Sequence, residues 1–324
     1  MSFLNKIKLN YNIKLLDDHI ANHNNAEIYN LLKNTKSSKS EYFFTLLNHL
    51  NHKYANSADG ENLFPNKYTI ISSFHYDDQK FVSNFLKFYF EKTHHFSKIE
   101  DLSDAVANDL ENLNIATLPD QITFNQMVEY SDFFLNSLLL ELDDSEKDYF
   151  LSSNAAFFEG PNNKFLIYPN RTRAYIFIHN HPFNIYASLR DKYKNQQVAL
   201  NELFNFENNL ISSQKKINKY QILENRQSWS VHANSWLDPN VHSSYNGLSI
   251  GIKEIIKDPI DTFTRLVFHL KQAGLGLEVD YQAIEQFCSK NRLDTIDPEI
   301  SNKEKKLIMS NLDPKILERL DYEI

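Results

Sequence analysis

Residues 173–193 read R-A-Y-I-F-I-H-N-H-P-F-N-I-Y-A-S-L-R-D-K-Y, and this stretch decides the fold class. Its β-branched and aromatic run at 174–179 predicts a strand. Pro182 then marks a turn, after which the pattern over 184–194 predicts a helix. A strand that leads directly into a helix is the building unit of parallel sheets, because parallel strands need a crossover connection. We therefore expect an α/β protein.

The turn of this unit has the form of a phosphate site without its usual residues. Where such sites hold arginine, lysine or glycine, this turn holds Asn180, His181 and Phe183. Ser188 lies on the following helix, where its hydroxyl could either bind a phosphate or pack against the sheet. His179 and His181 are two residues apart and could share a metal ion. No third ligand follows from the spacing, which favours ordinary polar roles for both.

Further strands and helices alternate along the chain. Residues 68–73 predict a strand, followed by a helix over 78–90 with Asp77 and Asp78 as candidate N-terminal caps. Gly274 should end a helix that begins at Pro259. Other predicted strands cover 164–168 and 248–252, and other predicted helices cover 101–113, 121–142, 199–212 and 226–237. Strands separated by helices predict a parallel sheet with helices on both faces.

The first 62 residues form a helical pattern of their own. The runs I-Y-N-L-L-K and Y-F-F-T-L-L-N-H-L-N each have one apolar face, and the polar stretch N-S-A-D-G-E-N ends them. We therefore expect a helical N-terminal appendage over residues 1–64, a boundary near Pro65, and an α/β domain over residues 65–324.

Composition excludes several classes of protein. The 324 residues are 42% hydrophobic and 13% aromatic, which is too apolar for a disordered chain. A net charge of −8 argues against nucleic acid as the main partner, since phosphate binding needs clustered lysine and arginine. The single cysteine, Cys288, allows no intrachain disulfide, which favours a cytoplasmic location. No run approaches the roughly 18 apolar residues of a membrane span, so we expect a soluble protein without a signal peptide.

Three pieces of the chain, in order, resemble the sulfotransferases that depend on 3′-phosphoadenosine 5′-phosphosulfate. Residues 69–86, T-I-I-S-S-F-H-Y-D-D-Q-K-F-V-S-N-F-L, are similar to the family's strand, phosphosulfate loop and helix. Residues 175–190 are similar to its strand, Arg-x-Pro turn and helical serine. Residues 228–238 and 251–263, with tryptophans and then Asp258-Pro259, resemble its Trp-containing helix and strand-Leu-x-x-Asp-Pro signature. The likeness covers roughly residues 65–290.

The resemblance implies a P-loop-like sheet and a defined reaction. A sulfuryl group would pass from 3′-phosphoadenosine 5′-phosphosulfate to an acceptor hydroxyl or amine. As in phosphoryl transfer, cations and backbone N–H groups must neutralise the oxygens while the bridging bond breaks. A general base must also take the proton of the acceptor. The acceptor stays open, because such pockets are built from variable loops.

Residue by residue, the resemblance implies a donor site with altered charges. The phosphosulfate loop aligns with residues 76–80, which makes Tyr76 and Lys80 candidate donor-binding residues. The arginine that binds the 3′-phosphate aligns with Asn180, and the helical serine aligns with Ser188. The family's basic strand with a catalytic histidine should fall near residues 154–159, where Glu159 is the candidate base.

Two hypotheses follow from these residues. In the first, a divergent sulfotransferase holds its donor with Lys80, Ser188 and either Arg171 or Arg173. In the second, the protein is a pseudoenzyme that acts as a binding or scaffold partner through its N-terminal helices. The second gains weight from the carboxylates within residues 76–80, since one like-charge contact near 4 Å at an effective dielectric of 20 costs about 4 kcal/mol. A third, weaker hypothesis is another enzyme for an anionic ligand.

Overall fold

The computed structural model describes residues 3–22, 68–95, 97–101, 148–153, 172–204, 228–293 and 298–322, together with isolated positions between 24 and 49. In the N-terminal part, helix α1 spans Phe3–Ala21, and its Asp17 carboxylate lies 2.8 Å from the His49 ring. The predicted boundary near Pro65 lies outside the described residues. The same holds for the predicted strand at 164–168 and for nearly all of the predicted helices at 101–113 and 121–142.

The centre of the fold is a five-stranded sheet in the order β2-β3-β1-β4-β5. All neighbouring strands are parallel, which confirms the predicted α/β class with a parallel sheet. The strands are β1 (Tyr68–Ser73), β2 (Ser97–Asp101), β3 (Asp148–Ser153), β4 (Thr172–His179) and β5 (Gly247–Gly251). Sequence patterns predicted β1, β4 and β5. They missed β2 and β3, which carry charged and hydroxyl residues.

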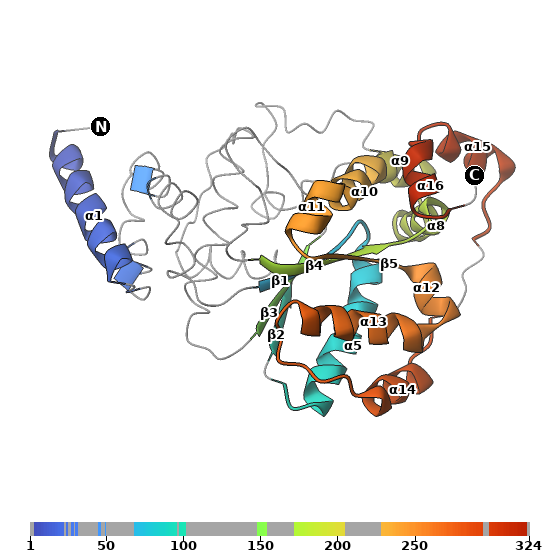
Figure 1. Cartoon of the computed structure of the whole chain (residues 1–324). Coiled ribbons are helices and arrows are strands. Elements are labelled where there is room, and N and C mark those ends of the chain that lie inside the picture. The colour runs from blue at the N-terminus through green and yellow to red at the C-terminus, as the bar shows by residue number, and fades with distance from the viewer. Residues whose placement is uncertain are drawn as a thin grey trace.

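Helices cover the sheet on both faces (Figure 1). They are α5 (Tyr76–Lys92), α8 (Pro182–Tyr193), α9 (Gln196–Phe204), α10 (Trp229–Leu237), α11 (Pro239–Ser244), α12 (Ile252–Lys257), α13 (Pro259–Gln272), α14 (Tyr281–Lys290), α15 (Asn302–Met309) and α16 (Pro314–Arg319). Gly274, with a φ of +92°, follows the end of α13 as predicted. No helix in the described part of the chain is both long and apolar enough to cross a membrane.

Strand β4 is buried on both faces, which is why it reads as a continuous apolar run. Ile176 and Ile178 join the core beneath α5, α13 and α14, where Phe85 stacks on Phe263 with ring centroids 3.9 Å apart. On the other face, the Tyr175 hydroxyl donates to the Trp236 carbonyl at 2.6 Å. This alternation follows from the two-residue period of a strand.

Candidate functional site

The strand order creates a topological switch point between β1 and β4. These two strands pair directly, yet the chain leaves β1 towards β2 on one side and leaves β4 towards β5 on the other. In open α/β sheets, ligands bind outside the carboxyl ends of the strands at such a point. The candidate site is therefore the carboxyl-edge cluster, which we define as His75, Asp78, His179, Asn180 and Ser188.

Two helices begin at this edge and bring the cluster together. Helix α5 starts at Tyr76 after β1, and α8 starts at Pro182 after β4. The Asn180 amide nitrogen donates to Asp78 Oδ1 at 3.0 Å, so the two turns are joined directly. Ser188 Oγ of α8 lies 3.4 Å from Nε2 of His75, the N-cap of α5, which gives a second contact between the two helices. The fold thus brings together two motifs that are far apart in the sequence, since Asp78 and Asn180 are separated by 102 residues.

Asn180 is engaged on both ends of its amide. Its Oδ1 accepts from the His181 backbone N–H at 2.8 Å and from the Asn184 side chain at 3.0 Å, while its nitrogen donates to Asp78. His181 is the N-cap of α8, and its Nδ1 accepts from the Phe183 backbone at 3.1 Å. An asparagine in this position orders the turn. It supplies no positive charge, unlike the arginine that the resemblance implies.

Asp78 is the titratable carboxyl group of the cluster. Burial raises its pKa to about 7, the negative charge of Asp77 adds to the shift, and the hydrogen bond from Asn180 opposes it. Neither aspartate is the N-cap predicted from the sequence, because His75 is the N-cap and both carboxylates lie in the first turn of α5. Asp77 has a side chain that is 73% exposed. The edge is therefore less negative near neutral pH than two ionised aspartates would make it.

His75 lies between Ser188 and Asp77 in the order of a serine, histidine and aspartate relay. The ring is buried, and its Nδ1 lies 3.7 Å from Asp77 Oδ2. This separation is too long for a hydrogen bond, so the aspartate does not orient the ring as it does in a catalytic triad. Ser73 Oγ donates to the His75 carbonyl at 2.6 Å and holds the turn instead. The contact with Ser188 positions α8 against α5.

His179 ends β4 and contacts a residue that the sequence did not reveal. Its Nδ1 lies 2.6 Å from the hydroxyl of Tyr322, which is buried with 6% of its surface exposed. Burial lowers the pKa of His179 to about 4, so the ring is neutral at physiological pH. A Cβ on Gly251 would lie 3.0 Å from His179 Cε1, which shows how tightly the ring is packed. No local pattern marks Tyr322, because it meets His179 across 143 residues.

The basic residues proposed for the donor lie elsewhere or on the surface. Arg173 forms an ion pair with Asp148 at the amino ends of β4 and β3, opposite the cluster, so its interpretation as a replacement donor cation is wrong. Lys80 is exposed on α5. In the described part of the chain, the side-chain hydrogen bonds of Asp78, Asn180 and Ser188 are with one another and with His75, His181 and Asn184, none of which is a lysine or arginine. Glu159 and Arg171 lie outside the described residues, and Tyr76 is placed only as the first residue of α5.

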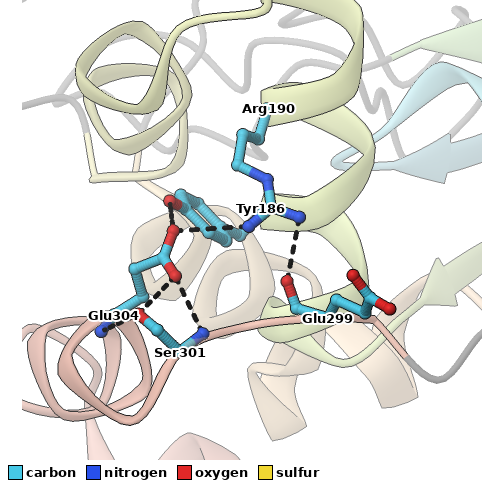
Figure 2. Close-up of polar contacts among 5 residues, drawn as sticks. All are labelled: Tyr186, Arg190, Glu299, Ser301 and Glu304. Atoms are coloured by element: carbon cyan, nitrogen blue, oxygen red, sulfur yellow. Dashed lines mark hydrogen bonds and ion pairs between the residues drawn. The ribbon is translucent and has the colours of Figure 1, made fainter.

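A second polar network fixes the C-terminal helices to α8 (Figure 2). Glu304 accepts hydrogen bonds from the Tyr186 hydroxyl at 2.6 Å and from the Ser301 backbone at 2.8 Å. Arg190 lies 3.4 Å from the same carboxylate and also donates to the Glu299 carbonyl at 3.0 Å. The Ser301 hydroxyl, followed by Tyr186, lowers the pKa of Glu304 to about 2. Helix α15 is thereby anchored to α8.

A cleft of about 530 Å³ lies apart from the cluster, between α5, α12, α13 and α14. Its charged side chains are Lys257, Arg292 and Glu285, which include both signs. Cys288 lines it, and burial followed by the charge of Asp258 raises the pKa of this thiol to about 11. A protonated thiol is a poor nucleophile. Across the described ranges, no three His, Cys, Asp or Glu side chains form a metal-binding group.

Comparison with known proteins adds no family to this description. No protein-family model matches the chain, and a comparison with curated proteins gives no match either. The function must therefore be argued from the chemistry of the cluster and from the sequence motifs that it unites.

Proposed function

We propose that this is a sulfotransferase-like protein with a P-loop-like sheet, and that the carboxyl-edge cluster takes the 3′-phosphoadenosine nucleotide. The observation that carries the proposal is the convergence of two strand-turn-helix units. The units β1-α5 and β4-α8 are neighbours in one parallel sheet, and Asp78 meets Asn180 between them at 3.0 Å. These are the two pieces that, by the resemblance, would hold the phosphosulfate and the 3′-phosphate.

Electrostatics at this edge support an anionic ligand below about pH 7. The N-termini of α5, with 17 residues, and of α8, with 12 residues, both lie here and favour negative charge. With its pKa near 7, Asp78 is largely protonated in mildly acidic solution. A neutral carboxyl group can donate to a phosphate oxygen, whereas an ionised one repels it. Binding should therefore strengthen as the pH falls through 7.

In the proposed reaction, an acceptor oxygen or nitrogen attacks the sulfur atom of 3′-phosphoadenosine 5′-phosphosulfate. The bond between sulfur and the bridging phosphate oxygen breaks, and adenosine 3′,5′-bisphosphate leaves with that electron pair. The proton of the acceptor passes to a general base. We assign this base to Glu159, the candidate from the sequence, while Ser188, Asn180, Lys80 and Tyr76 are assigned to donor binding.

A second candidate function is a non-catalytic binding or scaffold protein of the same fold. The specific observation in its favour is that Asn180 is already occupied by Asp78, His181 and Asn184. A neutral amide also binds phosphate more weakly than a bidentate guanidinium. In this case the partner is a protein, which we place on the N-terminal helices.

Calorimetric titration with adenosine 3′,5′-bisphosphate at pH 6 separates the two functions. Micromolar binding that is lost in Ser188→Ala and kept in the control Ser289→Ala, an exposed serine on α14, would support donor binding. Absence of binding at millimolar nucleotide would exclude the sulfotransferase mechanism and leave the scaffold function. Equal binding by both variants would show that the nucleotide does not use Ser188 and would contradict its assignment to donor binding.

A further inference from the structure

We propose that residues 320–322, which follow α16, are an internal cover of the carboxyl-edge cluster with Tyr322 as its anchor, and that a ligand must displace this tyrosine to reach the cluster. The proposal concerns the regulation of the proposed nucleotide site and in that respect rests on the proposed function. Its structural part, that Tyr322 shields the end of β4, can be tested without any nucleotide.

Tyr322 is seated by several contacts at the end of β4. Its hydroxyl lies 2.6 Å from His179 Nδ1. Its ring centroid lies 5.6 Å from that of His179 and 4.9 Å from that of His181, both in edge-to-face geometry. Only 6% of the residue is exposed. The phenol therefore occupies the position above β4 that a ligand at the switch point would need.

The ring contacts place the phenol at the carboxyl end of β4, where charges on the neighbouring turns also act on it. The negative charges of Asp78, which follows β1, and Glu254, which follows β5, both act on the hydroxyl and raise its pKa, after the larger effect of burial. Tyr322 thus lies over β4 and within electrostatic reach of the turns on both neighbouring strands. An anion bound beside Asp78 would therefore lie within electrostatic reach of the phenol.

The chain can release the tyrosine without unfolding the helices that precede it. Helix α15 is held to α8 by Glu304. Helix α16 is held to α10 by hydrogen bonds from the Asp313 backbone to Ser230 and from Arg319 to the Leu237 carbonyl. Asp321 has a φ of +54°, a strained conformation for a residue other than glycine, so release of the segment relieves strain. Beyond Asp321, the backbone bond from Tyr322 N–H to the Leu317 carbonyl at 2.9 Å is the contact that must open together with the ring.

The nucleotide arm of the test compares Tyr322→Ala with Tyr281→Ala in the full chain. Tyr281 is a matched control, since it is 60% exposed on α14. A closed cover reduces apparent affinity by the fraction of open molecules. We expect adenosine 3′,5′-bisphosphate to bind Tyr322→Ala about tenfold or more tightly than the parent, and Tyr281→Ala to match the parent. An affinity that is unchanged or lower in Tyr322→Ala would overturn the gating.

The second arm measures the modification of His179 by diethyl pyrocarbonate, located by mass spectrometry. Tyr322→Ala should raise the rate at His179 at least tenfold. Tyr322→Phe keeps the ring and loses one hydrogen bond, so it should raise the rate of His179 modification about fivefold. This second variant provides the test if the alanine variant does not fold. Unchanged rates in the folded variants would refute the cover. If His179 becomes reactive but no variant binds the nucleotide, the cover stands and the proposed donor site fails.

Discussion

Replacing Asp78 with asparagine should remove part of the pH dependence of the free energy of unfolding. The pKa of Asp78 is about 7 in the folded chain against 3.8 for an ordinary aspartate. The folded state therefore holds its proton more tightly than the unfolded state, and the free energy of unfolding falls as the pH rises from 3.8 to 7. Asp78→Asn cannot ionise, and its side-chain oxygen can still accept the bond from Asn180.

The magnitude follows from the pKa difference. Each unit corresponds to about 1.36 kcal/mol, so between about pH 5.5 and pH 8.5 the remaining 1.5 units up to the folded pKa amount to about 2 kcal/mol. Asp78 is half-buried as a residue, and the remaining contact with water reduces this figure. We therefore expect Asp78→Asn to gain about 1 to 2 kcal/mol relative to the parent over this interval.

Urea unfolding of both proteins at pH 5.5 and 8.5 measures this difference, because titrations shared by the two proteins cancel. Asp77→Asn is the matched control, since Asp77 occupies the same helical turn with a side chain that is 73% exposed. The difference in free energy of unfolding between Asp77→Asn and the parent should change little between pH 5.5 and pH 8.5. A stability difference for Asp78→Asn that is constant with pH, or that falls as the pH rises, would refute the assignment of a raised pKa.

Three further predictions test the fold and the site. Glu304→Gln should lower the free energy of unfolding by about 2 kcal/mol at pH 7, as measured with urea. Because the pKa of Glu304 is about 2 in the folded chain against 4.5 ordinarily, this difference should vanish as the pH falls from 4.5 towards 2, and a difference that persists at pH 2 would contradict the prediction. Gly247→Ala should lower stability by about 1 to 3 kcal/mol because its Cβ would collide with Tyr175, while Gly276→Ala, with no atom within 4 Å, should change it little; equal thermal shifts would contradict this packing. Glu159→Gln should slow sulfuryl transfer by about 10² to 10⁴ and leave nucleotide affinity unchanged, and full activity would exclude Glu159 as the base.

The sequence predicted the parts of the fold whose residues interact locally. Strand β4 and helix α8 follow from an apolar run, a proline turn and a helical pattern, all within 173–193. Helix α13 follows from Pro259 at its start and Gly274 beyond its end. These signals are reliable because backbone preference and hydrophobic period act over a few residues. Strand β2, S-K-I-E-D, has too few apolar residues for such a signal.

The candidate site likewise has features that local sequence predicts and features that depend on packing between distant segments. The residue types at the two turns are read directly from the local pattern, which places Asn180 and Ser188 after one strand and Asp78 after another. Three features follow from packing and not from local pattern. Burial raises the pKa of Asp78 to about 7, Arg173 lies at the opposite edge with Asp148, and the Tyr322 hydroxyl contacts His179. Burial, the edge of the sheet on which a side chain lies, and contact across 143 residues depend on how distant segments pack, which no local pattern encodes.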